Sequence, residues 1–417
     1  MTSEIAVYNS QGIALAADSA VTSLSNGKIY NSATKIFSLT KPHSVGIMFY
    51  GNADYLGIPW ETLIKIHCER LPKEKLNTIE DYAKNFIDFI KNFQGYDRDT
   101  FVIPIYNQFL GEIINEVNQK LAQNKHVSEL KSDDVKKIIN EVISLKLDGW
   151  KKVSDNFYDK KEIAINLSKY SEKVFSSIDD EFIKTHFDKD IKKNMNLLAA
   201  EIFSKNGSLY ESYKSGVVIA GFGNNDYFPF IKAYDIFPTL GKNIKIVEKE
   251  TIDGKFQKSG IVPFAQREAV DTFLTGIDPD FRKTIDSYLS DFFIKMPDLI
   301  VQLVEKKNTL DEDSKLELNK SLIDFSKQFQ DSFNSNLNFL IRKNYLDKIM
   351  GVIGMLPKSE LAEMAETLIT ITSFKRKMSS DRETVGGPVD VVVISKGDGF
   401  IWIKKKNYYK HELNYTC

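Results

Sequence analysis

The chain has 417 residues, 42% of them hydrophobic, which allows two or three average domains and supports a sizeable core. Its formal net charge of -1 excludes the class of strongly basic proteins that bind nucleic acid through their overall charge. The two cysteines, Cys68 and Cys417, lie far apart and exclude a disulfide framework or a CxxC metal site.

The start of the chain has no basic flank and no long apolar segment. Its apolar run Ile13–Ala17 is too short for a signal peptide or a membrane span. We therefore expect a cytoplasmic protein with no membrane contact.

The first 51 residues predict two pairs of strands. The alternating run Thr2–Tyr8 is typical of a half-buried strand, and Gln11 and Gly12 turn the chain into the fully buried strand Ile13–Ala17. A polar loop over 19–32 follows. Two further strands, Lys35–Leu39 and Val45–Tyr50, end at Gly51.

This opening segment brings together residues suited to nucleophilic catalysis. A threonine hydroxyl needs a base, and removal of Met1 would give Thr2 its own α-amine as that base, with a reference pKa of about 7.7 to 8. Lys35 can keep the amine neutral, and Asp18 can hold Lys35 charged. The backbone N–H of Gly51 can stabilise an oxyanion. We expect Lys35 Nζ within hydrogen-bond reach of the Thr2 hydroxyl.

Helical patterns dominate the middle of the chain. Trp60–Leu71 predicts a helix that Pro72 ends. Residues 77–204 carry apolar side chains at helical spacing and predict a long helical insertion. A strand pair, Ser215–Gly223 and Phe228–Asp235, and a strand over Ile244–Val247 come next.

The last part of the chain alternates helices and strands. Phe264–Leu274 predicts the start of a helix, and 285–345 predicts further helices. A helix starting near Ser359, with a buried stripe, and a hairpin of Val389–Ile394 and Phe400–Ile403 complete the chain.

Several of these segments together resemble proteasome β-type subunits, a family that includes the HslV peptidase. The resemblance rests on Thr2, on GIALAADSAVT with Asp18, on TKIF with Lys35, and on VGIMFYGNAD with Gly51. The hairpin at SGVVIAGFG and the strand after the Gly-Gly turn in GGPVDVVVI extend it over roughly half of the chain.

The resemblance implies an α+β fold, the four-layer αββα sandwich of N-terminal nucleophile (Ntn) hydrolases. Residues 1–75, 205–265 and 356–417 would form this core. The segments 77–204 and 280–355 would be helical insertions.

The resemblance also implies a site. Thr2 would be the nucleophile, Asp18 and Lys35 its support, and Gly51 the oxyanion donor. Ser259 and Asp381 are the candidates for supporting positions, each about one place out of register with the family, and Val385 stands where the family has a serine.

The function that follows is that of a threonine peptidase, cleaving a polypeptide or a small amide without metal or organic cofactor. Family members self-assemble, which predicts a homo-oligomer, with an ATPase as a further candidate partner. The alternative is a catalytically inactive scaffold whose helical insertions bind a partner. The five histidines are scattered, without the spacing of metal ligands.

Overall fold

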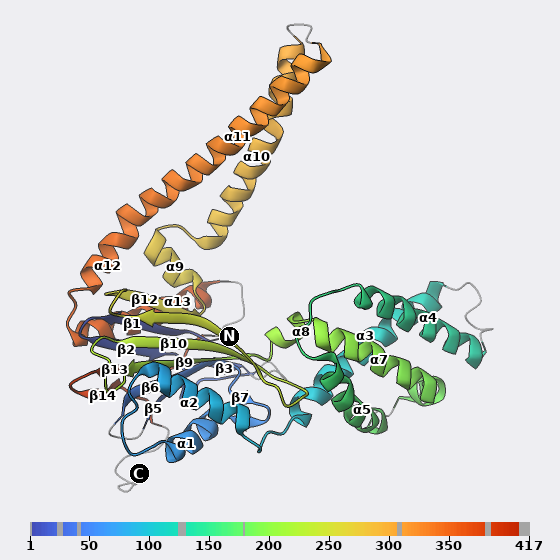
Figure 1. Cartoon of the computed structure of the whole chain (residues 1–417), viewed down its shortest axis with the longest axis horizontal. Helices are drawn as coiled ribbons and strands as arrows, with labels where there is room; N and C mark the ends of the chain where they lie inside the picture. Colours follow the sequence, from blue (N-terminus) through green and yellow to red (C-terminus); the bar gives the residue numbers. More distant parts are fainter. Residues whose placement is uncertain are drawn as a thin grey trace. The chain divides into compact units, whose positions relative to one another are not determined.

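A computed structural model describes residues 2–22, 28–39, 43–123, 131–177, 180–306, 311–379 and 385–407 (Figure 1). The chain divides into two compact units. The first contains Met1–Ile36, Tyr227–Pro229 and Asp253–Cys417. The second contains Phe37–Asp226 and Phe230–Ile252.

A five-stranded sheet organises the first unit, in the order β12-β1-β2-β13-β14, with its neighbours antiparallel. Its strands are β1 (Glu4–Asn9), β2 (Gly12–Ala17), β12 (Gly260–Ala265), β13 (Asp390–Ser395) and β14 (Gly399–Lys404). Two short strands pair beside them, β3 (Val21–Thr22) and β4 (Ile29–Tyr30), in the segment expected to be a loop.

The helices of the first unit follow β12. They are α9 (Glu268–Thr275), α10 (Pro279–Glu305), α11 (Glu312–Ile341), the π-helical turn Arg342–Leu346, α12 (Asp347–Ile353) and α13 (Lys358–Met378). The helix α13 packs on β1, β2 and β13. Its buried stripe, which includes Leu361, Ala365 and Leu368, confirms the amphipathic pattern of the sequence.

A second five-stranded sheet, in the order β11-β10-β9-β6-β5, organises the second unit. Its strands are β5 (Ile36–Ser38), β6 (Ser44–Gly51), β9 (Ser215–Phe222), β10 (Phe230–Phe237) and β11 (Lys245–Asp253). A small ladder of β7 (Asp54–Tyr55) and β8 (Ile58–Pro59) leads into the first helix. The strands predicted around Lys35, Tyr50, Gly216 and Tyr234 are confirmed.

The helices of the second unit share one apolar core with this sheet. They are α1 (Trp60–Arg70), α2 (Ile79–Asn92), α3 (Asp99–Gln123), α4 (Ser132–Lys151), α5 (Lys160–Ser177), α6 (Glu181–His186), α7 (Lys189–Lys205) and α8 (Ser208–Glu211). The helix α2 lies against β9 and β10, and α3, α4, α5 and α7 pack on one another. The start of the predicted helical insertion therefore contributes to the core of the sheet.

Two local expectations were wrong. Phe264 lies in the strand β12, and the helix expected from it begins only at Glu268. Pro263 is tolerated in this strand because β12 is at the edge of its sheet. The run Thr2–Tyr8 was expected to be half-buried, but all six residues of β1 are buried. The polar Asn9, for example, donates from Nδ2 to the carbonyls of Ile353 and Leu356, at 2.8 Å each.

In the part of the chain that the structure describes, no helix combines the length and the apolar character needed to cross a membrane.

Candidate active site

The pairing of β1 with β2 brings the start of the chain beside Asp18. Glu4 lies opposite Ala17 in this ladder, so Asp18 follows directly at the end of β2. The backbone N–H of Asp18 donates to the carbonyl of Ser3 at 3.1 Å, and the N–H of Ser3 donates to Asp18 Oδ1 at 3.1 Å. The strand pairing therefore fixes the distance between the start of the chain and this carboxylate.

Asp18 is a buried carboxylate whose oxygens are well supplied with donors. Besides Ser3, it accepts from the N–H groups of Ala20 at 3.3 Å and Gly386 at 3.0 Å. Lys35 Nζ donates to Asp18 Oδ1 at 2.5 Å. Hydrogen bonds to the charged form stabilise a buried carboxylate, so Asp18 is suited to hold a buried lysine in place.

Lys35 is fully buried and lies between two carboxylates. Its Nζ is 2.5 Å from Asp18 Oδ1 and 3.1 Å from Glu4 Oε1. The contact with Glu4 is an ion pair whose geometry is not that of a hydrogen bond. The expected pair of Asp18 and Lys35 is thus present, and Glu4 joins it as a third charged group.

Thr2 contacts this charged cluster through Glu4. Only 3% of Thr2 is exposed, and its Oγ1 donates to Glu4 Oε2 at 2.6 Å. We expected Lys35 to reach the hydroxyl directly, but among the described contacts the link from Thr2 to Lys35 passes through the Glu4 carboxylate. Thr2, Glu4, Lys35 and Asp18, in that order, form what we call the buried cluster.

Burial raises the pKa of Glu4 to about 7, and the neighbouring Asp18 charge adds to the rise. Lys35 and the Thr2 hydroxyl act in the opposite direction. A carboxylate that titrates near neutral pH and accepts a hydrogen bond from a hydroxyl can take the proton of that hydroxyl. The buried cluster therefore contains a base that the sequence analysis did not identify.

Glu4 left one signal in the sequence. Residues i and i+2 of a strand point to the same face, so the side chains of Thr2 and Glu4 share a face of the opening segment. A charged residue within a run that ends in buried apolar residues needs a buried partner, and Lys35 is that partner.

A second buried ion pair lies beside the cluster. Asp390 is opposite Ala17 in the β2–β13 ladder, and it accepts from the backbone N–H of Lys406 at 2.8 Å and from Lys406 Nζ. Burial lowers the pKa of Lys406, and the positive charge of Lys35 nearby lowers it further. Two lysines and three carboxylates are thus concentrated around the end of β2.

The remaining predicted site residues have different positions. Gly51 ends β6 in the second unit with φ of 84°, and a Cβ there would lie 2.8 Å from the carbonyl oxygen of Lys214. This backbone requires glycine, while its oxyanion role stays a prediction. Asp381 lies outside the described residues.

Ser259 lies at the other end of β1 from Thr2. In the β1–β12 ladder Gly260 pairs with Tyr8, so Ser259 adjoins the Tyr8 end, about 20 Å along the strand from Thr2. Its hydroxyl donates to the carbonyl of Met350 at 3.0 Å. Ser259 is therefore not part of the buried cluster.

Among the described residues, no group of three or more histidine, cysteine, aspartate or glutamate side chains has the arrangement to hold a metal ion. The carboxylates of the buried cluster instead accept hydrogen bonds from Lys35, backbone N–H groups and the Thr2 hydroxyl, while Glu4 Oε1 has the ion pair with Lys35.

No family model matches the chain, and no curated protein matches it. Among solved structures, the chain is similar to Anbu (ancestral beta-subunit) from Yersinia bercovieri, with 8% sequence identity and a TM-score of 0.28. That alignment covers 98% of this chain and 89% of the other. The likeness is distant, so the site has to be judged on its own geometry.

Proposed function

We propose that this chain is a threonine-type Ntn hydrolase, proteasome-like in its four-layer αββα architecture, that cleaves amide bonds with Thr2 as the nucleophile. One observation carries the proposal: the Thr2 hydroxyl donates at 2.6 Å to a buried carboxylate, Glu4, which pairs with Lys35, and Lys35 in turn pairs with Asp18. A buried hydroxyl, a base with a pKa of about 7 and a fixed cation are the groups that nucleophilic catalysis requires.

In the proposed reaction, Thr2 Oγ1 attacks the carbonyl carbon of the substrate amide while its proton passes to a base. After removal of Met1 the base is the α-amine or the Glu4 carboxylate. The tetrahedral oxyanion is stabilised by an N–H donor, for which Gly51 is the candidate. The proton then passes to the leaving amine, and water releases the acyl group from Thr2.

Lys35 supports either base by electrostatics. A nearby ammonium disfavours protonation of the α-amine and favours the ionised form of Glu4. The Asp18–Lys35 ion pair of 2.5 Å keeps this positive charge fixed. The substrate is a polypeptide or a small amide, and we further propose a cytoplasmic homo-oligomer, with an ATPase as a candidate partner.

One observation favours the alternative, an inactive scaffold with the same architecture. Only 3% of Thr2 is exposed, which leaves little room for a substrate at its hydroxyl. Val385 in place of the family's serine points the same way. Removal of Met1, which adjoins Thr2, would change the surroundings of the Thr2 hydroxyl. Whether Met1 is removed therefore distinguishes the hydrolase from the scaffold.

The test combines intact mass with covalent labelling. For the hydrolase we expect the purified chain to lack one methionine residue and to react with a peptide epoxyketone, and Thr2→Ala to abolish the reaction. The neighbouring Ser3→Ala variant is the matched control and keeps it. A chain that retains Met1 and stays unlabelled supports the scaffold and contradicts the hydrolase.

A further inference from the structure

The helices α10 and α11 have almost no core of their own. Figure 1 shows them running side by side in opposite directions, and they comprise 27 and 30 residues. Their buried side chains are Phe293, Pro297 and Val301 on α10 and Ser326 on α11. Helices of this length in water normally bury a continuous apolar stripe.

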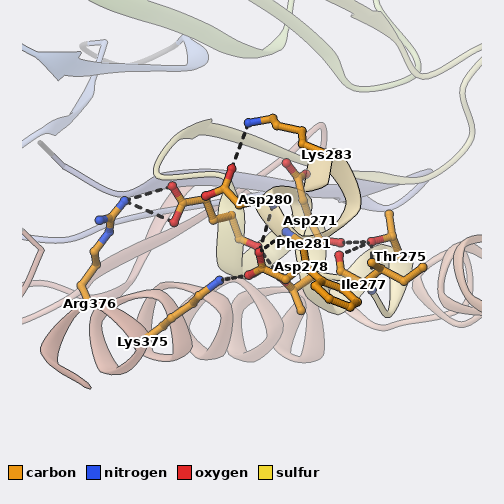
Figure 2. A network of polar contacts seen from close by, with 11 residues as sticks. Asp271, Thr275, Ile277, Asp278, Asp280, Phe281, Lys283, Lys375 and Arg376 are labelled. Carbon is orange, nitrogen blue, oxygen red and sulfur yellow. Dashed lines mark hydrogen bonds and ion pairs between the residues drawn. The ribbon is translucent and has the colours of Figure 1, made fainter. Parts of the chain in front are cut away.

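The base of this helical hairpin is firmly held (Figure 2). Asp278 Oδ1 accepts from the N–H groups of Asp280 and Phe281 at the start of α10, at 3.0 and 3.3 Å. Its other oxygen accepts from Lys375 Nζ of α13 at 2.6 Å. Arg376, also of α13, pairs with a carboxylate oxygen of Glu268 on α9 at 3.3 Å. The hairpin is thus anchored to the helix that covers the first sheet.

The α10 residues that face α11 recur every four positions, at Phe293, Pro297 and Val301. A second stripe of exposed apolar side chains runs along one side of them. It includes Tyr288, Phe292, Leu299 and Leu303, which are 75%, 55%, 54% and 62% exposed.

A matching stripe lies on α11. Phe325, Phe329 and Phe333, spaced by four, are 57%, 50% and 37% exposed, and Phe325 directly precedes the buried Ser326. On each helix, the residue directly before one that contacts the other helix points to one side of that contact. Because both helices are right-handed and run in opposite directions, these residues of α10 and α11 point to the same side of the hairpin. The centroids of the Phe329 and Phe293 rings are 5.5 Å apart, so the α11 stripe contacts α10. We call these seven side chains the apolar face.

The other side of the hairpin is mostly polar. The positions after Pro297 and Val301 are Asp298 and Gln302, and Asp298 accepts a hydrogen bond from Asn319 of α11 at 3.3 Å. Ile294, Leu316 and Ile323 are exposed apolar residues on this mostly polar side, at 68%, 69% and 52%. The hairpin is therefore amphipathic, with its apolar face in solvent.

The exposed area is large enough for a stable interface. A large apolar side chain exposed by about half contributes about 100 Å², so the apolar face exposes about 700 Å². The largest apolar patch on a typical monomer is about 300 to 600 Å², and a standard interface covers about 800 Å² on each partner. This area is near the size of one half of such an interface.

We propose that the apolar face packs against the same face of a second copy of this chain, which gives a four-helix bundle. An identical hairpin matches both helices over their whole length, and a two-fold contact covers the two stripes of both copies at once. The seven side chains of the apolar face are themselves uncharged, so burying them takes no charged group out of water.

The test compares two double variants of the full chain by sedimentation equilibrium. We expect the wild type to contain dimers or larger even-numbered assemblies, and Phe292→Asp with Phe329→Asp to weaken this association at least about 100-fold. The control, Ile294→Asp with Ile323→Asp, puts the same charges on the polar side and leaves association unchanged. A monomeric wild type, or an association that the face variant leaves intact, overturns the proposal.

If circular dichroism shows that the face variant has lost helix, a second measurement that needs no substitution tests the proposal. Lysine cross-linking of mixed isotopically labelled and unlabelled wild type should join Lys295 of one copy, which adjoins Phe292 and Leu299 on α10, to the hairpin of another. Links between copies confined to other surfaces contradict the four-helix bundle.

Discussion

Replacing Glu4 by glutamine should change how the stability of this protein depends on pH. Glutamine keeps the shape of the side chain and an oxygen that can accept from Thr2, but it does not titrate. Burial raises the pKa of Glu4 from 4.5 to about 7 in the folded protein. This difference in pKa between the folded and unfolded chain corresponds to about 3 kcal/mol of differential stability.

The sign follows from where the proton binds more tightly. The folded protein holds the Glu4 proton up to a higher pH than the unfolded chain does. The stabilising contribution is therefore fully present below the unfolded pKa of 4.5 and is lost as pH rises through about 7. Relative to Glu4→Gln, the wild type should lose about 3 kcal/mol of unfolding free energy between about pH 4 and pH 8.

Urea unfolding of both proteins over this pH range measures the difference directly. Glu61→Gln, which removes an exposed carboxylate from α1, is the control for the loss of one acidic group. The difference in unfolding free energy between wild type and Glu4→Gln could instead stay constant with pH, or grow in favour of the wild type as pH rises. Either result would refute the claim that Glu4 is buried and becomes protonated near neutral pH.

Two further substitutions test the surroundings of the buried cluster. Lys35→Met leaves the neighbouring carboxylates without their cation and should lower the unfolding free energy by about 3 kcal/mol or more in urea, whereas Lys65→Met, on a 65% exposed side chain, should change it by less than about 1 kcal/mol. An equal loss of unfolding free energy in Lys35→Met and Lys65→Met would contradict the buried ion pairs of Lys35. Gly387→Ala should cost about 1 to 3 kcal/mol in thermal unfolding, because φ is 78° and the new Cβ would lie 2.8 Å from Asn31 Cβ. Gly397→Ala meets no atom within 4 Å and is the control, so equal melting temperatures for the two variants would count against this backbone strain.

The sequence predicted most of the strands because their signals are local. The small apolar run before Asp18 and the apolar runs around Lys35 and Tyr50 each have strand length, and turn residues bound them. The helix α13 was predictable for a similar reason, since its apolar stripe has the helical period and follows Pro357.

Pairing across the sheet could not be predicted in the same way. The pairing register of β1 with β12 places Ser259 at the end of β1 that is remote from Thr2, and no local pattern contains that register. Phe264 was assigned to a helix because a short apolar run fits either a strand or a helix start.

The role of Glu4 depends on tertiary contacts. In an alternating strand a glutamate normally faces solvent, so its position predicts an exposed side chain. Only the folded chain brings Lys35 to 3.1 Å from its carboxylate and makes burial possible. The predicted pair of Asp18 and Lys35 is present, but its link to Thr2 passes through Glu4.

The most direct test of the hydrolase proposal is to locate the epoxyketone adduct by peptide mapping of the labelled wild-type chain. The account predicts a single adduct on Thr2 as the first residue, and Thr2→Ser, which keeps a hydroxyl beside Glu4, should still be labelled. An adduct on any other residue, or a Thr2→Ala variant labelled as fast as the wild type, would contradict Thr2 as the nucleophile.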